Sequence, residues 1–259
     1  MKDKKKTVLI TGASGGIGRE FAYIFARKGC DLILVARSQD KLEQLASDCV
    51  SKHGVHTTVL VYDLSRPASA EDLYHDVRQR GLRVDVLINN AGFGHYGPLL
   101  KDDFRKNTEM IILNVTSLVT LTTLFVKEMA ERNHGQILNV ASTAAFQPVP
   151  NFAVYGATKA FVLSFTEALH YELRNTQVTV SALCPGPTST GFEKAADMEG
   201  SKLFKSGVMS AQVVAEIGYK GLQKGKMTIV PGLKNKMMAI ASNMTPSRDL
   251  LVWVAGKMS

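Results

Sequence analysis

Short runs of consecutive apolar residues recur along the chain, separated by longer amphipathic stretches. Seven runs have the length and β-branched content of strands: 7–11, 31–36, 57–62, 84–89, 135–141, 178–184 and 227–230. They are continuous rather than alternating, as expected for strands covered on both faces. Helical patterns occupy 16–28, 39–52, 70–79, 103–131, 154–174 and 211–223. This alternation predicts an α/β fold, a doubly wound parallel seven-stranded sheet with helices on both faces.

The composition is that of a globular protein, because 45% of the residues are hydrophobic and 21% are charged. No linker interrupts the alternation, so we expect one domain over residues 1–259. The apolar run near the N-terminus is too short for a signal peptide, and no long uncharged apolar run predicts a spanning helix. Three cysteines without C-x-x-C spacing favour a reducing, cytoplasmic location and no metal site. A net charge of +8, spread along the chain, favours anionic ligands without a nucleic-acid motif.

A glycine-rich stretch, TGASGGIGRE, follows the first predicted strand, with glycines at 12, 16 and 18. Such glycines permit a tight turn, close approach of the backbone to a phosphate, and close helix–strand packing. The spacing differs from the common G-x-G-x-x-G fingerprint, so the stretch could also be an ordinary turn. Its position after the first strand favours a dinucleotide site of the Rossmann type, with the phosphates at the helix N-terminus.

The end of the second strand indicates which dinucleotide binds. An acidic residue there would bind the 2′-hydroxyl of the adenine ribose, whereas the sequence has Ala36 and then Arg37. A guanidinium can bind a 2′-phosphate through forked, charge-assisted hydrogen bonds. The alternative is an ordinary surface arginine. NADP(H) is therefore the expected cofactor, with NAD(H) as the second choice.

Tyr155 and Lys159 stand four residues apart in a predicted helix, so they share one face. A free tyrosine has a pKa of about 10, and a neighbouring ammonium lowers that pKa. The pair could exchange a proton with a carbonyl or alcohol, while Lys159 could also bind a ribose hydroxyl. Many Tyr–Lys pairs at this spacing do nothing chemical, so other residues must support the interpretation.

Two further polar residues supply that support. Ser142 follows the fifth predicted strand, at the edge where ligands of such sheets bind, and could hydrogen-bond a substrate oxygen. Its alternative role is a helix cap. Asn114 lies within a predicted helix, where asparagine is unfavourable without a specific role. It is either a solvated residue or part of a water chain that leads to Lys159.

Taken in order, TGASGGIG, NNAG (89–92), Asn114, Ser142, YGATK (155–159) and PGPTSTGF (185–192) resemble the short-chain dehydrogenase/reductase family, one-domain type. The resemblance implies an NAD(P)-dependent oxidoreductase that needs no metal. It implies Tyr155 as the catalytic acid/base, Ser142 as the stabiliser of the substrate oxygen, Lys159 as the partner of the tyrosine and ribose, and Asn114 as part of a proton relay.

The resemblance also implies the cofactor-binding set. Its members are Gly12, Ser14, Gly16, Ile17, Gly18, Arg37, Asp63, Leu64, Asn90, Ala91, Gly92, Tyr155, Lys159, Pro185, Gly186, Thr188 and Thr190. Asp63 would contact the adenine, and residues 185–190 would cover the nicotinamide. One departure is Gly15, at a position where some NADP-using members carry a basic residue. Arg37 would then act alone.

The expected reaction is the reduction of a ketone or aldehyde to an alcohol, or the reverse, on an apolar small molecule. Residues 192–210 would cover the substrate, as that region does in the family, and His95 and Tyr96 could border the same pocket. The C-terminal extension 233–259 is Met-rich and basic, with a helix start near Thr245–Pro246. It could pack on the domain, contact another subunit or lie on a membrane, and packing or oligomer contact is favoured.

Two alternatives stay open within this resemblance. One is a 3-oxoacyl thioester reductase, for which the positive charge would attract an acidic carrier or CoA. The other is a non-catalytic NADP-binding sensor, which would not need the tyrosine. A homodimer or homotetramer is expected, as is common in the family.

Overall fold

A computed structural model describes residues 5–191 and 208–258. Seven strands pair in parallel in the order β3-β2-β1-β4-β5-β6-β9, which confirms the predicted sheet. Their bounds are β1 (Thr7–Thr11), β2 (Asp31–Ala36), β3 (Thr57–Val61), β4 (Val86–Asn89), β5 (Gly135–Val140), β6 (Val178–Leu183) and β9 (Thr228–Ile229). The strand order reverses between β1 and β4, and ligands of such sheets bind beyond the carboxyl ends at this reversal.

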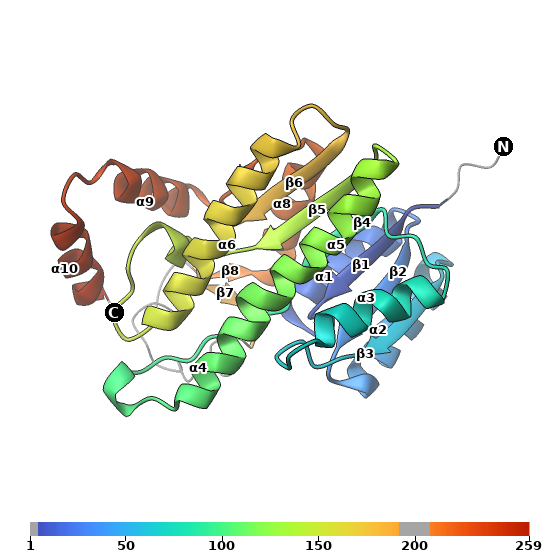
Figure 1. Ribbon diagram of the computed structural model, residues 1–259, viewed down its shortest axis with the longest axis horizontal. Helices are drawn as coiled ribbons and strands as arrows, with labels where there is room; N and C mark the ends of the chain where they lie inside the picture. Colours follow the sequence, from blue (N-terminus) through green and yellow to red (C-terminus); the bar gives the residue numbers. More distant parts are fainter. Residues whose placement is uncertain (1–4, 192–207, 259) are drawn as a thin grey trace.

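Helices cover both faces of the sheet (Figure 1). One face is covered by α1 (Gly16–Arg27), α2 (Gln39–His53) and α8 (Ala211–Gln223). The other is covered by α3 (Ser69–Gln79), α5 (Leu118–Glu131) and α6 (Ala153–Glu172). Successive strand residues point to opposite faces, so Val8 and Ile10 join the first cluster and Leu9 the second. Because both faces are buried, the strands read as continuous apolar runs.

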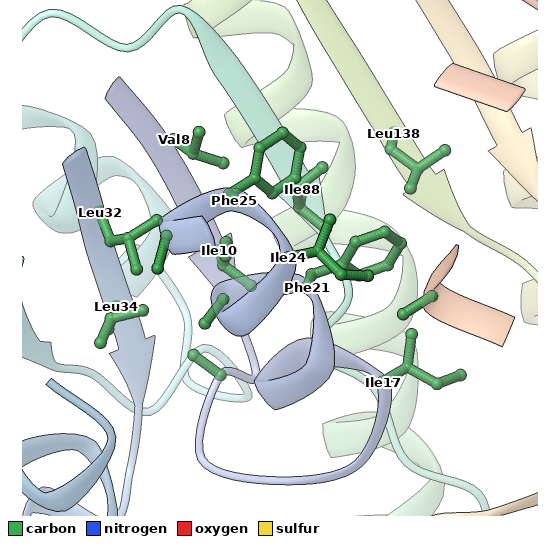
Figure 2. Packing of buried hydrophobic residues seen from close by; sticks show 14 of the residues in the cluster. Val8, Ile10, Ile17, Phe21, Ile24, Phe25, Leu32, Leu34, Ile88 and Leu138 are labelled. Atoms are coloured by element: carbon green, nitrogen blue, oxygen red, sulfur yellow. The ribbon is translucent and has the colours of Figure 1, made fainter. Parts of the chain in front are cut away.

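Packing of α1 fixes the direction of its N-terminus. Figure 2 shows Phe21, Ile24 and Phe25 of α1 against apolar side chains of β1, β2 and β4. Phe21 and Phe25 are fully buried, and each buried aromatic side chain contributes roughly 1.5–3 kcal/mol. The helix begins at Gly16, directly after the glycine-rich turn, so its free N-terminal amides lie next to the ligand-binding edge.

The helix predicted over 103–131 is interrupted by a π-helical segment. α4 (Phe104–Ile111) passes into the π-helix Ile112–Ser117 and then into α5. Asn114 and Ser117 are buried within that segment. π-helical turns are rare, appear mostly as single-turn bulges inside α-helices, and are frequent at functional sites. The unfavourable asparagine noted in the sequence is therefore in a distorted turn.

Within the described part of the chain, Phe104–Glu131 also has the length and hydropathy of a membrane-spanning helix. The sequence patterns had not suggested such a segment. Leu121, Phe125 and Met129 of α5 are buried against the sheet in one core cluster. A core helix of this kind passes the same test of length and hydropathy as a spanning helix.

The C-terminal extension forms two helices, α9 (Leu233–Met244) and α10 (Arg248–Met258). The second begins close to the predicted Thr245–Pro246 boundary. Figure 1 shows both helices apart from the sheet, at the end toward which the arrow of β5 points. Two short strands, β7 (Thr188–Ser189) and β8 (Met209–Ser210), pair in parallel nearby. Of the predicted substrate-covering segment 192–210, residues 192–207 are outside the described part of the chain.

Candidate active site

A cavity of about 900 Å³ opens beyond the carboxyl ends of the strands. All predicted cofactor-binding residues except Gly18 contribute to its lining, as do Ser142, Tyr155 and Lys159. These residues come from the ends of β1 to β6, so parallel pairing of the strands brings them to one edge. Its lining thus includes residues of both the glycine-rich turn and helix α6.

Two glycines of the first turn have φ values that side chains rarely adopt, +65° at Gly12 and +51° at Gly16. A Cβ at Gly18 would meet the carbonyl oxygen of Gly12 well inside van der Waals contact. Gly18 therefore permits close helix–strand packing, whereas Gly12 and Gly16 shape the turn. A Cβ at Gly15 would meet nothing within 4 Å, so that position is open.

Basic and acidic residues lie at the end of the cavity that follows β2 and β3. Arg37 follows β2, and Lys41 lies in the first turn of α2. Both line the cavity. Burial raises the pKa of Asp63, but hydrogen bonds from Ser65 and the nearby Arg37 outweigh it and leave that pKa below its usual value. Asp63 Oδ1 accepts from the Ser65 hydroxyl at 2.6 Å and the Ser65 amide at 3.1 Å. Asp63 is thus held ionised and oriented.

In the NNAG stretch, the first residue is part of the protein core and the next three line the cavity. Asn89 is buried and donates to Thr122 and Asn139, which ties β4 to β5 and α5. Asn90 and Ala91 instead line the cavity, and their amides both donate to the hydroxyl of Thr11 at 3.0 Å. The segment beside the glycine-rich turn is therefore fixed by the end of β1.

Tyr155, Ser142 and Lys159 lie together where β5 ends and α6 begins. Ser142 lies close enough to Tyr155 to lower its pKa, and its hydroxyl accepts from the amide of Ala144 at 3.1 Å. Lys159 is buried, and its Nζ donates to the carbonyl oxygen of Val140 at 2.9 Å. The predicted cap role of Ser142 is also observed, because it caps the short 3₁₀ helix Thr143–Phe146.

The pKa values of this group differ from the expectation. Burial raises the pKa of Tyr155 to about 12, and the hydrogen bond from Ser142 only partly opposes it. Lys159 Nζ is 5.7 Å from the centre of the tyrosine ring and is directed to Val140 instead. Burial lowers the pKa of Lys159 to about 8, with Cys184 acting in the opposite direction. In the protein alone, burial dominates both pKa values, and the predicted lowering of the tyrosine pKa by Lys159 is not observed.

Asn114 does not line the cavity but lies next to it. Its Nδ2 donates to the carbonyl oxygen of Phe93 at 2.9 Å and to Thr158 Oγ1 at 3.1 Å, while its Oδ1 accepts from the Phe93 amide at 3.2 Å. A Cβ added at Gly92 would lie 3.0 Å from Asn114 Oδ1 and 3.3 Å from Lys159 Nζ. Asn114 and Lys159 therefore approach the same point on the backbone.

The far end of the cavity has a largely apolar lining. It is formed by Phe93, Val149, Phe152, Met238 and Ala255, with Gln147 as a polar member. Phe152 stacks on Tyr155 with ring centres 4.2 Å apart and an interplanar angle of 19°. This wall suits an apolar group next to the reacting centre.

Of the two predicted border residues, neither lines the cavity. His95 Nε2 is 2.7 Å from Asp102 Oδ1, and the Tyr96 ring packs edge-on against Phe152 at 5.9 Å. Tyr96 therefore meets a lining residue, Phe152, rather than the cavity itself.

Several lining residues had no clear signal in the sequence. Lys41 stands four residues after Arg37, a spacing that could have suggested it once the helix start was known. Asn235, Met238 and Ala255 come from α9 and α10, which the sequence could not place over the cavity. Asn235 fills the space beside Gly186, where a Cβ would come within 2.5 Å of its amide. Among residues 5–191 and 208–258, no three His, Cys, Asp or Glu side chains gather as metal ligands would.

Comparison with known proteins gives the class of this site. Residues 6–199 match the family model described as short chain dehydrogenase. The chain therefore belongs to the short-chain dehydrogenase family, as its motifs indicated. It is an oxidoreductase that acts on CH–OH or carbonyl groups, and members of the family use NAD(P)(H).

Two curated relatives illustrate the range of substrates. A very-long-chain 3-oxoacyl-CoA reductase of Anas platyrhynchos is 34% identical over 221 residues, which cover 83% of this chain and 69% of the relative. A 17-beta-hydroxysteroid dehydrogenase type 3 of Mus musculus is 30% identical over 244 residues, which cover 93% and 76%. The chain spans only 60% of the Bos taurus 3-oxoacyl-CoA reductase that it matches.

Solved structures agree on the fold. A short-chain dehydrogenase from Sphingobium yanoikuyae in complex with NADPH superimposes with a TM-score of 0.83 at 31% identity, over 93% of this chain and 97% of the other. A short-chain dehydrogenase/reductase from Burkholderia phymatum in complex with NAD gives 0.82 at 25% identity, over 95% and 98%. Both nicotinamide cofactors therefore occur among similar structures.

Proposed function

We propose that this protein reduces the carbonyl group of an apolar substrate to an alcohol, with NADPH as reductant and Tyr155 as proton donor. The observation that carries the proposal is that Ser142 and Tyr155 both line the wall of the cavity, close enough for Ser142 to lower the pKa of the tyrosine. Two hydroxyl groups that converge on one point can both bind a single substrate oxygen. An apolar wall beside them, with Phe152 stacked on Tyr155, accommodates the rest of the substrate.

The protonation states favour reduction. Because burial raises the pKa of Tyr155 to about 12, the side chain carries its proton at neutral pH. It can therefore donate to the substrate oxygen, while Ser142 hydrogen-bonds the same oxygen and polarises the carbonyl. A bound nicotinamide cofactor supplies the hydride. Lys159, with a pKa of about 8, can lose and regain a proton near neutrality and so return one toward Tyr155.

The preference for NADPH rests on the adenine end of the cavity. Arg37 and Lys41 both line it, and two cations suit a 2′-phosphate better than a 2′-hydroxyl. Position 15 is a glycine, so Lys41 would supply the second positive charge in its place. NAD(H) use would be weaker, because it would not engage these two charges.

A 3-oxoacyl thioester is the second candidate substrate. The relatives named very-long-chain 3-oxoacyl-CoA reductase support it, as does the net charge of +8. A steroid is the alternative suggested by the hydroxysteroid relative. The two candidates differ in shape and charge, since CoA is long and anionic whereas a steroid is rigid and neutral.

We also propose that the protein forms homodimers or homotetramers. Exposed apolar side chains support this, in particular Phe161 and Tyr171 on α6 and Ile111 at the end of α4. Helical surfaces of this kind are typical subunit contacts. Light scattering on the purified protein would test the assembly.

The decisive experiment follows the absorbance of NADPH and NADH with medium-chain ketones, a 3-oxoacyl-CoA and a 17-ketosteroid. Tyr155→Phe is compared with Tyr96→Phe, which removes a hydroxyl from a neighbouring ring outside the cavity lining. We expect Tyr155→Phe to lose about 10²–10⁴-fold in turnover, while Tyr96→Phe stays near the wild type. Retention of most activity in Tyr155→Phe would refute the role of Tyr155. NADPH binding without any turnover would instead favour the sensor.

A further inference from the structure

Helix α9 presents its larger apolar side chains to solvent. Leu233, Met237, Ile240 and Met244 are 74%, 63%, 59% and 76% exposed. Their spacing of three and four residues places them on one face of the helix. A stripe of four large apolar side chains on an outer surface is unusual for a soluble protein, whose exposed helix faces are normally polar.

The buried face of α9 is the less hydrophobic one. Ala239 and Ser242 are buried, and the Ser242 hydroxyl donates to Gln147 Oε1 at 3.2 Å. Asn235 donates to the carbonyl oxygen of Pro231 at 2.7 Å. Small and polar residues thus fix α9 to the domain, so the outer apolar stripe is not needed to hold it there. Exposed apolar patches of this kind mark interaction sites.

The neighbouring helix extends the same kind of surface. On α10, Leu250, Val252, Trp253 and Val254 are exposed, whereas Leu251 and Ala255 are buried. Figure 1 shows α9 and α10 together at one end of the molecule, far from the N-terminus. On the opposite, inward side of these helices, Met238 of α9 and Ala255 of α10 line the cavity. The exposed apolar surface is therefore the outer side of two helices that close the substrate end of the cavity.

Cations border this surface. Lys234 and Lys236 flank the stripe on α9, and Arg248 begins α10; all three are exposed. Asp249 is the one acidic residue in the sequences of the two helices. Apolar residues with a tryptophan, bordered by Lys and Arg, form the pattern that binds at the interface of an anionic bilayer.

We propose that α9 and α10 dock this protein on an anionic lipid surface, with Leu233, Met237, Ile240, Met244 and Trp253 inserted at the level of the headgroups. A second copy of the chain fits the same surface less well. A symmetric contact would bring Lys234 and Lys236 of both copies together, with few acidic groups to neutralise them. Lipid phosphates supply that neutralisation, and the docked cavity would receive apolar substrates directly from the bilayer.

The test uses the full chain with vesicles of phosphatidylcholine alone and of phosphatidylcholine mixed with phosphatidylglycerol. Trp253 is the single tryptophan of the chain, so its emission reports on α10 without labelling. We expect co-sedimentation with the anionic vesicles, little with the neutral ones, and a blue shift of the Trp253 emission. Lys234→Gln combined with Lys236→Gln should weaken binding by about 25-fold, at roughly fivefold per lysine.

Met237→Ser combined with Ile240→Ser should weaken binding by about 100-fold, at roughly tenfold per buried side chain. Val50→Ser, which alters an exposed apolar side chain on α2, is the matched control and should bind as the wild type does. Circular dichroism and NADPH binding verify that each variant is folded. No sedimentation with any vesicle, equal binding to neutral vesicles, or wild-type binding by the serine variant would each overturn the proposal. Loss of a dimer in the serine variant, without vesicle binding by the wild type, would identify a subunit interface instead.

Discussion

The side-chain amide of Asn114 makes two hydrogen bonds with the backbone of Phe93, donating to its carbonyl oxygen at 2.9 Å and accepting from its N–H at 3.2 Å. This pairing joins the π-helical turn before α5 to the segment that follows β4. Phe93 lines the cavity, whereas Asn114 does not. In the protein alone, Asn114 therefore holds the backbone of a residue of the cavity wall in place.

Asn114→Asp keeps the shape of the side chain but removes both N–H donors. The carbonyl oxygen of Phe93 would lose its partner, and a carboxylate would replace a neutral amide that is fully buried. We expect the free energy of unfolding to fall by about 3 kcal/mol. Chemical denaturation measures this, with Thr116→Ala, an exposed position in the same turn, as control. Equal stability of both variants would show that the hydrogen bonds between Asn114 and Phe93 do not stabilise the fold.

Arg37→Ala tests the preference for NADPH. If the guanidinium binds the 2′-phosphate, its loss should raise the KM for NADPH by about tenfold and leave the KM for NADH nearly unchanged. Adding Lys41→Ala should bring the two cofactors close to equality. The matched control is Arg80→Ala, directly after α3, where the arginine pairs with Asp76 instead. Equal losses for both cofactors after Arg37→Ala would contradict a 2′-phosphate contact.

Lys159→Met tests the energetic effect of the buried ammonium. The folded lysine loses its proton near pH 8, whereas the unfolded one holds it to about pH 10.5. Between these values the unfolded state binds more protons at this lysine, so the contribution of Lys159 to the stability of the wild type should rise with pH, by about 3 kcal/mol in total. Below pH 8 this gain is absent. The variant should lack the rise and be more stable at neutral pH by about 1–3 kcal/mol, after loss of the bond to Val140.

The comparison of unfolding curves for Lys159→Met and wild type must be made as a difference. Burial also raises the pKa values of Cys49, Cys184 and Tyr155, and these groups lower stability as the pH rises above about 9. Because all three are present in both proteins, their contribution cancels in the difference. A difference that does not change between pH 8 and 10 would mean that Lys159 has an ordinary pKa.

Gly18→Ala and Gly15→Ala separate packing from turn flexibility within one stretch. The methyl group at 18 would collide with the carbonyl oxygen of Gly12, whereas the methyl group at 15 would meet nothing within 4 Å. We expect Gly18→Ala to destabilise the protein by about 1–3 kcal/mol, because α1 must move off β1. Gly15→Ala should unfold at nearly the wild-type temperature. Differential scanning calorimetry decides, and the reverse order of stabilities would disprove the packing role of Gly18.

The sequence predicted the sheet, its helices and the convergence of Ser142, Tyr155 and Lys159, because these depend on local periodicity and on one rule about strand ends. It did not predict the raised pKa of Tyr155, since that shift comes from burial by residues far apart in the chain. Nor did it place Met238 and Ala255 at the cavity. Their location depends on how α9 and α10 pack on the domain. The spacing of apolar residues does not predict which side of these helices faces the cavity.

The close approach of Asn235 to Gly186 has one more consequence. It brings α9 against the loop after β6, so the part of the described cavity lining that comes last in the sequence belongs to α9 and α10. A single genetic crossover after β9 would therefore exchange α9 and α10 for those of another family member. On the functions proposed above, such a hybrid would change its substrate range and its membrane binding while keeping Ser142, Tyr155 and Lys159 in place, provided that residue 235 still fits beside Gly186.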